Sequence, residues 1–286
     1  MVTMVKSDWP ENRIAALAGK EWLSLWERRG SQAAPAVSFR QDAAKKAFEV
    51  ACENGTVVIR AAEPVEILYG VYDFAENFLG YCFFEPGCDR LEADGPVVLP
   101  ENGVLIADRE VLIHRRGFIQ EFPFDRESFR TADWMAKNKL NYLMTWMKYY
   151  DEIGEELKAF FAERGIEIES GHHNFDYWIP GKKYGSTYPH FFAEIGGARI
   201  SPSGDKSALL LSEQLCTTNP ALRAEIIRNM VAYCRKHPEV RTISLVPNDG
   251  FGWCECDNCS KFYDPNRKGD WYSVSEHVYL ADRIYH

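Results

Sequence analysis

Three cysteines stand within six residues of one another in the segment SLVPNDGFGWCECDNC. Cys254, Cys256 and Cys259 have the short spacing of thiolate ligands for tetrahedral zinc, which requires a fourth ligand. The best candidate is Cys216, which lies just before a predicted helix on the same side of the predicted sheet. The sequence therefore predicts a metal site at these four residues, with free thiols that only shape a loop as the alternative.

The sequence fits other kinds of cysteine chemistry less well than it fits a zinc site. Cys256 and Cys259 have the C-x-x-C spacing of thioredoxin-like proteins, but that motif normally opens a helix in a much smaller domain. An iron–sulfur cluster would also require a fourth cysteine. The chain has eight cysteines and no visible secretory signal, which favours free thiols or metal ligands over disulfides.

A second group of candidate residues follows four predicted strands. In parallel α/β architectures, ligands bind beyond the carboxyl ends of the strands. The residues at these ends are Glu121, then Trp146, then His172 and His173 with Trp178 downstream, then Asn248 and Asp249. Flat rings stack on sugar C–H groups, while imidazole, amide and carboxylate groups bond hydroxyls, so the set suits a polyhydroxylated ligand.

Each of these residues also has a structural interpretation. Glu121 could simply pair with an arginine, and Asp249 could shape the turn before Gly250. Because adjacent strand residues point to opposite faces, we expect one of His172 and His173 to face the ligand and the other to pack. The same two histidines are the alternative source of a fourth metal ligand.

The elements that must position these residues follow from periodicity and from Gly, Pro and Asn signals. In the first 112 residues we expect an α+β domain with helices at 12–30, 43–55 and 63–80 and strands at 56–61 and 81–84. Gly80 is placed to terminate the third helix.

Strands and helices alternate from residue 113 to 286. The predicted strands are 115–123, 141–147, 166–175 and 240–249, and the predicted helices are 125–140, 153–165, 219–238 and 273–286. Asp125 is placed to cap the first of these helices, and residues 174–218 are rich in loops. Four βα units imply parallel strands, as in part of a (βα)8 TIM barrel. A full barrel needs about 250 residues, so we expect this barrel to be truncated.

Composition limits the class of protein. Hydrophobic residues make up 46% and charged residues 26%, which indicates a globular chain. The net charge of −9 argues against nucleic acid and anionic membranes as main partners. No run approaches 18 apolar residues, so no membrane span is expected. Without a visible signal peptide the expected location is the cytoplasm, or the exterior if the true N-terminus is missing.

Several segments resemble known glycoside hydrolases. GTVVIRAAEPVEILYGVYDFAENFLGYCFFEPG is similar to the N-terminal domain that precedes the barrel in glycoside hydrolase families 20 and 67. RRGF, DWMAKNKLNYL, QLCTTNP and VPNDGFGWCECDNC resemble the domain-of-unknown-function family 4838, which includes the endo-β-N-acetylglucosaminidases of family 163. The resemblance covers about residues 45–286 and implies an α+β domain, a (βα)8 barrel and hydrolysis of a glycan, an N-acetylhexosaminide or a uronide.

The resemblance also implies roles for residues. In family 67, the α-glucuronidases, a glutamate in an Asn-x-Glu-Gly pattern is the general acid, and Asp249 takes that place here with a shorter reach. The acid would need a poorly hydrated pocket, which Trp146, Trp178 and Trp253 could supply. Glu121 is the second candidate carboxylate, while Asn248 and the histidines would position the sugar.

Three alternatives remain open at this point. Because the base side of family 67 comes from later strands, this chain could be an inactive fragment. A non-catalytic glycan-binding or scaffold protein could have the same fold. A zinc-dependent hydrolase would place the metal in the pocket, whereas the first interpretation requires no cofactor for catalysis and leaves zinc a structural role.

Overall fold

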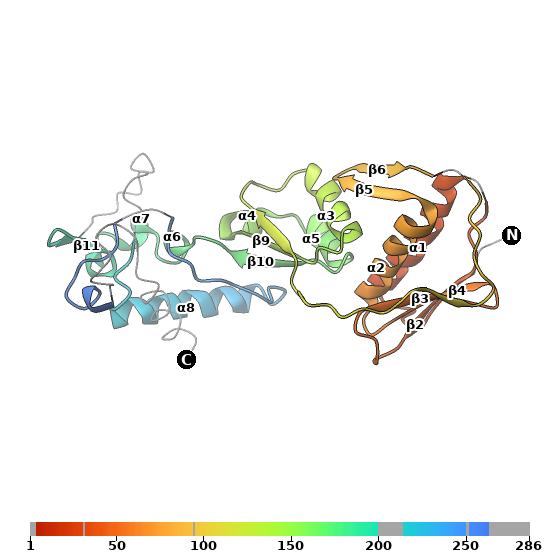
Figure 1. The fold of residues 1–286 in the computed structure, drawn as a ribbon. Helices are drawn as coiled ribbons and strands as arrows, with labels where there is room; N and C mark the ends of the chain where they lie inside the picture. The colour runs from red at the N-terminus through yellow and green to blue at the C-terminus, as the bar shows by residue number, and fades with distance from the viewer. Residues whose placement is uncertain (1–3, 31, 94, 200–213, 250–251, 263–286) are drawn as a thin grey trace. The chain divides into compact units, whose positions relative to one another are not determined.

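The computed structural model describes residues 4–30, 32–93, 95–199, 214–249 and 252–262 (Figure 1). They form two compact units. The N-terminal unit comprises the described residues within Met1–Ile119, Pro123–Leu143 and Ile153–Glu167, and the C-terminal unit those within Gln120–Phe122, Met144–Glu152 and Ile168–His286. The predicted helix at 273–286 lies outside the described residues.

A five-stranded open sheet with the order β1-β2-β4-β3-β7 organises the N-terminal unit. Its strands are β1 (Val5–Ser7), β2 (Val37–Gln41), β3 (Phe48–Glu53), β4 (Thr56–Ala61) and β7 (Gly103–Ile106). Strands β1, β2 and β4 are parallel, whereas β3 is antiparallel to β4 and β7. The apolar face of this sheet forms the core of the unit with two helices.

Helices α1 (Arg13–Arg29) and α2 (Pro64–Phe74) lie where the sequence predicts helices, and they cover this sheet (Figure 1). Both helices have the expected ends. Asn12 caps α1 and left-handed Gly30 ends it, while α2 continues into the π-helical η1 (Ala75–Leu79) and stops at left-handed Gly80. The hairpin of β5 (Tyr81–Glu85) and β6 (Cys88–Leu91) follows.

The predicted helix at 43–55 is wrong, because its second half is strand β3. Asn54 and Gly55 have φ values of 50° and 73°, and they form a two-residue turn that pairs β3 with β4 in a hairpin. Asn-Gly is a strong hairpin signal, and β-branched and apolar residues on both sides of it form the buried ladder. The dipeptide therefore marks a turn between strands and not a helix end.

Strands β8 (Gly117–Gln120), β9 (Tyr142–Trp146) and β10 (Glu167–Gly171) form a second open sheet in the order β10-β9-β8. Three helices follow or precede these strands, namely α3 (Glu127–Lys137), α4 (Met147–Glu152) and α5 (Glu155–Ala162). The carboxylate of Asp125 caps α3 as predicted, accepting hydrogen bonds from the backbone N–H groups of Glu127 and Ser128.

The fourth predicted strand is only partly present. Residues 242–246 pair with the β10 segment in parallel at two bridges, Ser170 with Ile243 and His173 with Val246. The side chain of fully buried Asn174 continues the pairing, since its Nδ2 donates to Ser244 O at 2.7 Å and its Oδ1 accepts from Val246 N at 3.0 Å. A side-chain amide thus replaces the regular ladder here.

An apolar cluster of helices and short strands forms the rest of the C-terminal unit. Its elements are α6 (Phe175–Trp178), α7 (Gly181–Tyr184), η2 (Pro189–Phe191), β11 (Glu194–Ile195), β12 (Ala198–Arg199), α8 (Pro220–Lys236) and η3 (Ser260–Phe262). Asn219 caps α8, the helix predicted at 219–238, by accepting from the N–H groups of Ala221 and Leu222.

Candidate functional site

Three aromatic rings gather where β9 and β10 end. Trp146 is the last residue of β9, and its ring centroid lies 4.7 Å from that of His172 and 5.9 Å from that of His173. The two imidazole centroids are 4.4 Å apart. The structure therefore brings together three of the residues predicted at the strand ends, and we call Trp146, His172 and His173 the ring cluster.

The two histidines do not point to opposite faces, as a continuous strand would require. His172 has a φ of 61°, in the left-handed region, so the extended backbone is interrupted between the two residues. Both rings can therefore contact Trp146. The His173 Nδ1 lies 2.6 Å from Pro247 O, and because a carbonyl oxygen only accepts, Nδ1 carries the proton.

Both predicted carboxylates interact with His172. The Glu121 Oε1 lies 3.5 Å from His172 Nε2, and the Glu121 side chain is 58% exposed. Asp249 is exposed as well and acts on the same imidazole electrostatically. The Nδ1 atom of His172 is buried and has no hydrogen-bond partner among the described residues. The ring cluster thus lies beside two exposed acids.

The pKa of His172 leads to a testable prediction about how the stability of the protein depends on pH. Burial, then the neighbouring His173, lowers this pKa below its ordinary 6.5, while Glu121 and Asp249 raise it less strongly. The unfolded chain therefore binds this proton more readily, so the free energy of unfolding should fall as the pH decreases below 6.5. We expect His172→Asn, which tolerates a left-handed backbone, to reduce this loss in urea titrations at several pH values.

A matched control is His190→Asn, which removes an exposed imidazole from the same unit. It should retain the pH dependence of the parent protein. Identical pH profiles for the parent and His172→Asn would contradict the prediction.

Asn248 is held by two hydrogen bonds that fix the end of the fourth segment. Its Oδ1 accepts from the Asp176 backbone N–H at 3.1 Å, and its carbonyl oxygen accepts from Gln214 Nε2 at 2.6 Å. Gln214 is fully buried, and its Oε1 has no partner among the described residues. The sequence did not predict the roles of Gln214 and Asn174 as buried amides, since these roles depend on contacts between distant segments.

Trp178 is not brought to the ring cluster. It is 3% exposed and lies in the apolar cluster of the C-terminal unit, where its ring packs edge-on against Tyr233 with a centroid separation of 5.7 Å. Trp253 is also buried, and is 9% exposed. The ring of Trp178 therefore has no exposed face with which to make the predicted contact with a sugar.

All four predicted cysteine ligands converge in the C-terminal unit. The sulfur atoms of Cys216, Cys254, Cys256 and Cys259 lie within 4.8 Å of one another. Cys256 is partly exposed, and the other three are buried. The histidines, the alternative source of a ligand, lie instead in the ring cluster. Among the residues that the structure describes, these four sulfurs form a group that could hold a metal ion.

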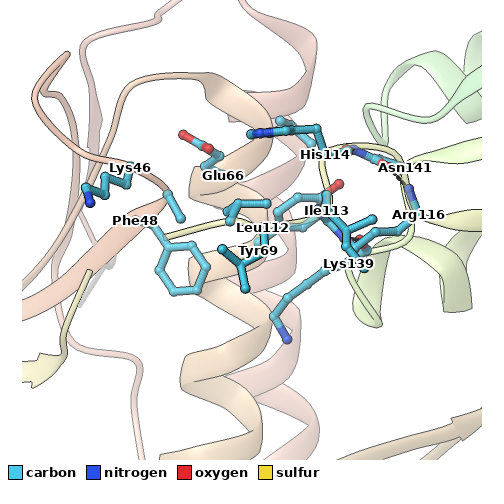
Figure 2. A pocket seen from close by; sticks show the side chains of 13 residues that line it. Lys46, Phe48, Glu66, Tyr69, Leu112, Ile113, His114, Arg116, Lys139 and Asn141 are labelled. Atoms are coloured by element: carbon cyan, nitrogen blue, oxygen red, sulfur yellow. Dashed lines mark hydrogen bonds between the residues drawn. The ribbon is translucent and has the colours of Figure 1, made fainter. Parts of the chain in front are cut away.

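A pocket of about 390 Å³ lies in the N-terminal unit (Figure 2). Apolar side chains, among them Phe48, Tyr69 and Leu112, line it together with Lys46 and Arg116. None of the residues predicted for catalysis, sugar binding or metal binding is among those that line it. We therefore place the candidate functional site at the strand ends of the C-terminal unit. Among the described residues, no helix combines the length and apolar composition needed to cross a bilayer.

Solved structures with similar architecture identify the fold. The β-N-acetylhexosaminidase of Bacteroides fragilis matches with a TM-score of 0.51 at 12% identity, covering 91% of this chain and 55% of that one. The glycoside hydrolase family 20 β-N-acetylhexosaminidase of Streptomyces coelicolor matches with a TM-score of 0.51 at 13% identity, covering 84% and 54%. The chain is thus a mixed α/β protein of glycoside hydrolase-like fold that spans about half the length of these structures.

A family model identifies this chain more specifically than the fold does. Residues 117–281 match the family described as domain of unknown function DUF4838. The match extends over more than half of the chain, which therefore belongs to this family, as its sequence motifs predicted. A comparison with curated proteins gave no match.

Proposed function

We propose that this chain is part of a glycoside hydrolase that acts on a glycan of the N-acetylhexosaminide or uronide class. The single observation that carries the proposal is the juxtaposition of the ring cluster with two acids, Glu121 and Asp249, at the ends of neighbouring strands. The structural neighbours named above are β-N-acetylhexosaminidases, which is consistent with a sugar ligand.

Asp249 is the proposed general acid. It donates its proton to the glycosidic oxygen as the bond from that oxygen to the anomeric carbon breaks, so the aglycone leaves as an alcohol. Glu121 is the second carboxylate, which takes a proton from the attacking water or polarises an acetamido group of the substrate. Trp146 offers a ring for stacking, and His172, His173 and Asn248 offer hydrogen bonds to hydroxyl groups.

The finer architecture belongs to the same proposal. We assign β8, β9, β10 and residues 242–246 as the first four strands of a (βα)8 barrel that begins near residue 113, after an α+β domain of the family 20 and 67 type. The parallel bridges between β10 and residues 243–246 support this assignment. In such a barrel, all four strand ends lie around one opening.

The test combines hydrolysis and binding. We expect the full-length protein to release 4-nitrophenol from a 4-nitrophenyl N-acetylhexosaminide or glucuronide and to bind glycans of one class on an array. Binding without hydrolysis would favour the alternative, a carbohydrate-binding protein on the same fold. Neither binding nor hydrolysis across a broad panel of glycans and aryl glycosides would contradict the proposal.

A further inference from the structure

We propose that Cys216, Cys254, Cys256 and Cys259 bind one zinc ion in a structural site that joins the loop carrying the last three cysteines to the segment before α8. The proposal rests on residues other than those proposed for hydrolysis. Three observations support the zinc site. They are the distances between the sulfur atoms, the groups that surround these atoms, and the presence of four protein ligands, which is the full number for tetrahedral zinc.

The sulfur–sulfur distances suit a single tetrahedral ion. The Sγ of Cys216 lies 3.7 Å from that of Cys256 and 3.9 Å from that of Cys259. Four sulfurs placed about 2.3 Å from a central zinc ion at tetrahedral angles are about 3.8 Å apart. A disulfide would require a separation of about 2.05 Å, so these thiols are not bonded in pairs. The two separations from Cys216 thus match the tetrahedral value, and all four sulfurs lie within 4.8 Å of one another.

Hydrogen-bond donors and a cation surround the sulfur atoms. The Glu194 backbone N–H donates to Cys254 Sγ at 3.4 Å, and Arg199 Nη1 lies 3.6 Å from the same sulfur. The Thr218 hydroxyl lies 3.1 Å from Cys259 Sγ. Four thiolates and one Zn²⁺ carry a net charge of −2, and such donors stabilise that charge and orient the ligands.

Arg199 is held in place for this role by other groups. Its Nη1 donates to the Phe192 carbonyl oxygen at 3.0 Å, and its Nη2 pairs with the Glu194 carboxylate at 3.2 Å. The guanidinium group therefore stays beside Cys254 without depending on the metal.

The ligand set points to a structural ion. Four protein sulfurs complete the tetrahedral shell, whereas a catalytic zinc keeps one position for water or substrate. Three ligands belong to residues 254–259, and the fourth lies three residues before the Asn219 cap of α8. Zinc would therefore hold two segments together, and its binding free energy would add to the stability of this unit.

Metal analysis of the reduced, purified protein tests the site. We expect about one zinc per chain by mass spectrometry, and after replacement with Co²⁺ the absorption bands of a tetrahedral cobalt–thiolate complex. A chelator should remove the metal and lower the Tm. Cys256→Ser changes the partly exposed ligand and should lose most of the zinc, whereas the control Cys234→Ser, an exposed cysteine outside the cluster, should retain it.

Two results would overturn the proposal. One is a fully reduced protein that contains no zinc and takes up neither Zn²⁺ nor Co²⁺. The other is iron at this site in place of zinc, since a tetrahedral set of four thiolates also suits iron. If Cys256→Ser does not fold, cobalt titration of the parent protein still shows whether the cysteines bind the metal, because cobalt–thiolate coordination has its own absorption bands. None of these measurements depends on glycan hydrolysis.

Discussion

Asp249→Asn is expected to lower the kcat for glycosides with poor leaving groups by about 10²- to 10⁴-fold, the usual contribution of a general acid. An amide keeps the size of the side chain and can form hydrogen bonds, but it has no acidic proton to transfer to the leaving oxygen. Glycan binding should therefore change little. Initial rates with an alkyl glycoside, together with KM and an independent Kd, measure the effect.

The leaving group provides the control for this prediction. A dinitrophenyl glycoside releases dinitrophenolate, which leaves without protonation, so Asp249→Asn should lose far less activity on it than on an alkyl glycoside. Glu152→Gln, which removes an exposed carboxylate from the same unit, should behave as the parent protein. Equal losses on both substrates, or unchanged turnover on the alkyl glycoside, would remove Asp249 from the acid role.

The elements that could be predicted are those whose signals are local. Helices α1 and α2 have regular apolar spacing and left-handed glycines at their ends, and both lie where the sequence places them. Strand β3 was missed because the short, mostly apolar run AFEVAC is compatible with either period. The Asn54-Gly55 turn signal and the antiparallel pairing with β4 resolve this ambiguity.

In the candidate site, too, local signals could be predicted, whereas features that depend on the folded backbone or on distant contacts could not. The strand-end rule placed Trp146, His172 and His173 together without any knowledge of the structure, and the cysteine spacing identified three of the four sulfurs that converge. The mutual arrangement of the two imidazoles was not predictable, because it depends on the left-handed backbone of His172. The pairing of the buried Asn174 and Gln214 amides was not predicted, because their partners are 70 and 34 residues away.

Gly171→Ala tests the arrangement on which the proposed hydrolase depends. Gly171 ends β10, and a Cβ atom added there would overlap the Ser244 hydroxyl and lie 2.9 Å from Ser244 Cβ. That hydroxyl accepts the His172 backbone N–H at 3.1 Å, so moving it leaves a donor without its partner. We expect the free energy of unfolding in urea to fall by about 2–4 kcal/mol, from overpacking and the lost hydrogen bond.

A second substitution separates this clash from a general intolerance of alanine. Because the closest overlap involves the Ser244 side chain, Gly171→Ala combined with Ser244→Gly should recover part of the lost stability. Gly154→Ala, where no atom lies within 4 Å of the added Cβ, should change it by less than about 1 kcal/mol. If Gly171→Ala were as stable as the parent protein, residue 244 would not lie against the end of β10. Asp249 would then have no fixed place beside the ring cluster, and the acid role would lose its structural basis.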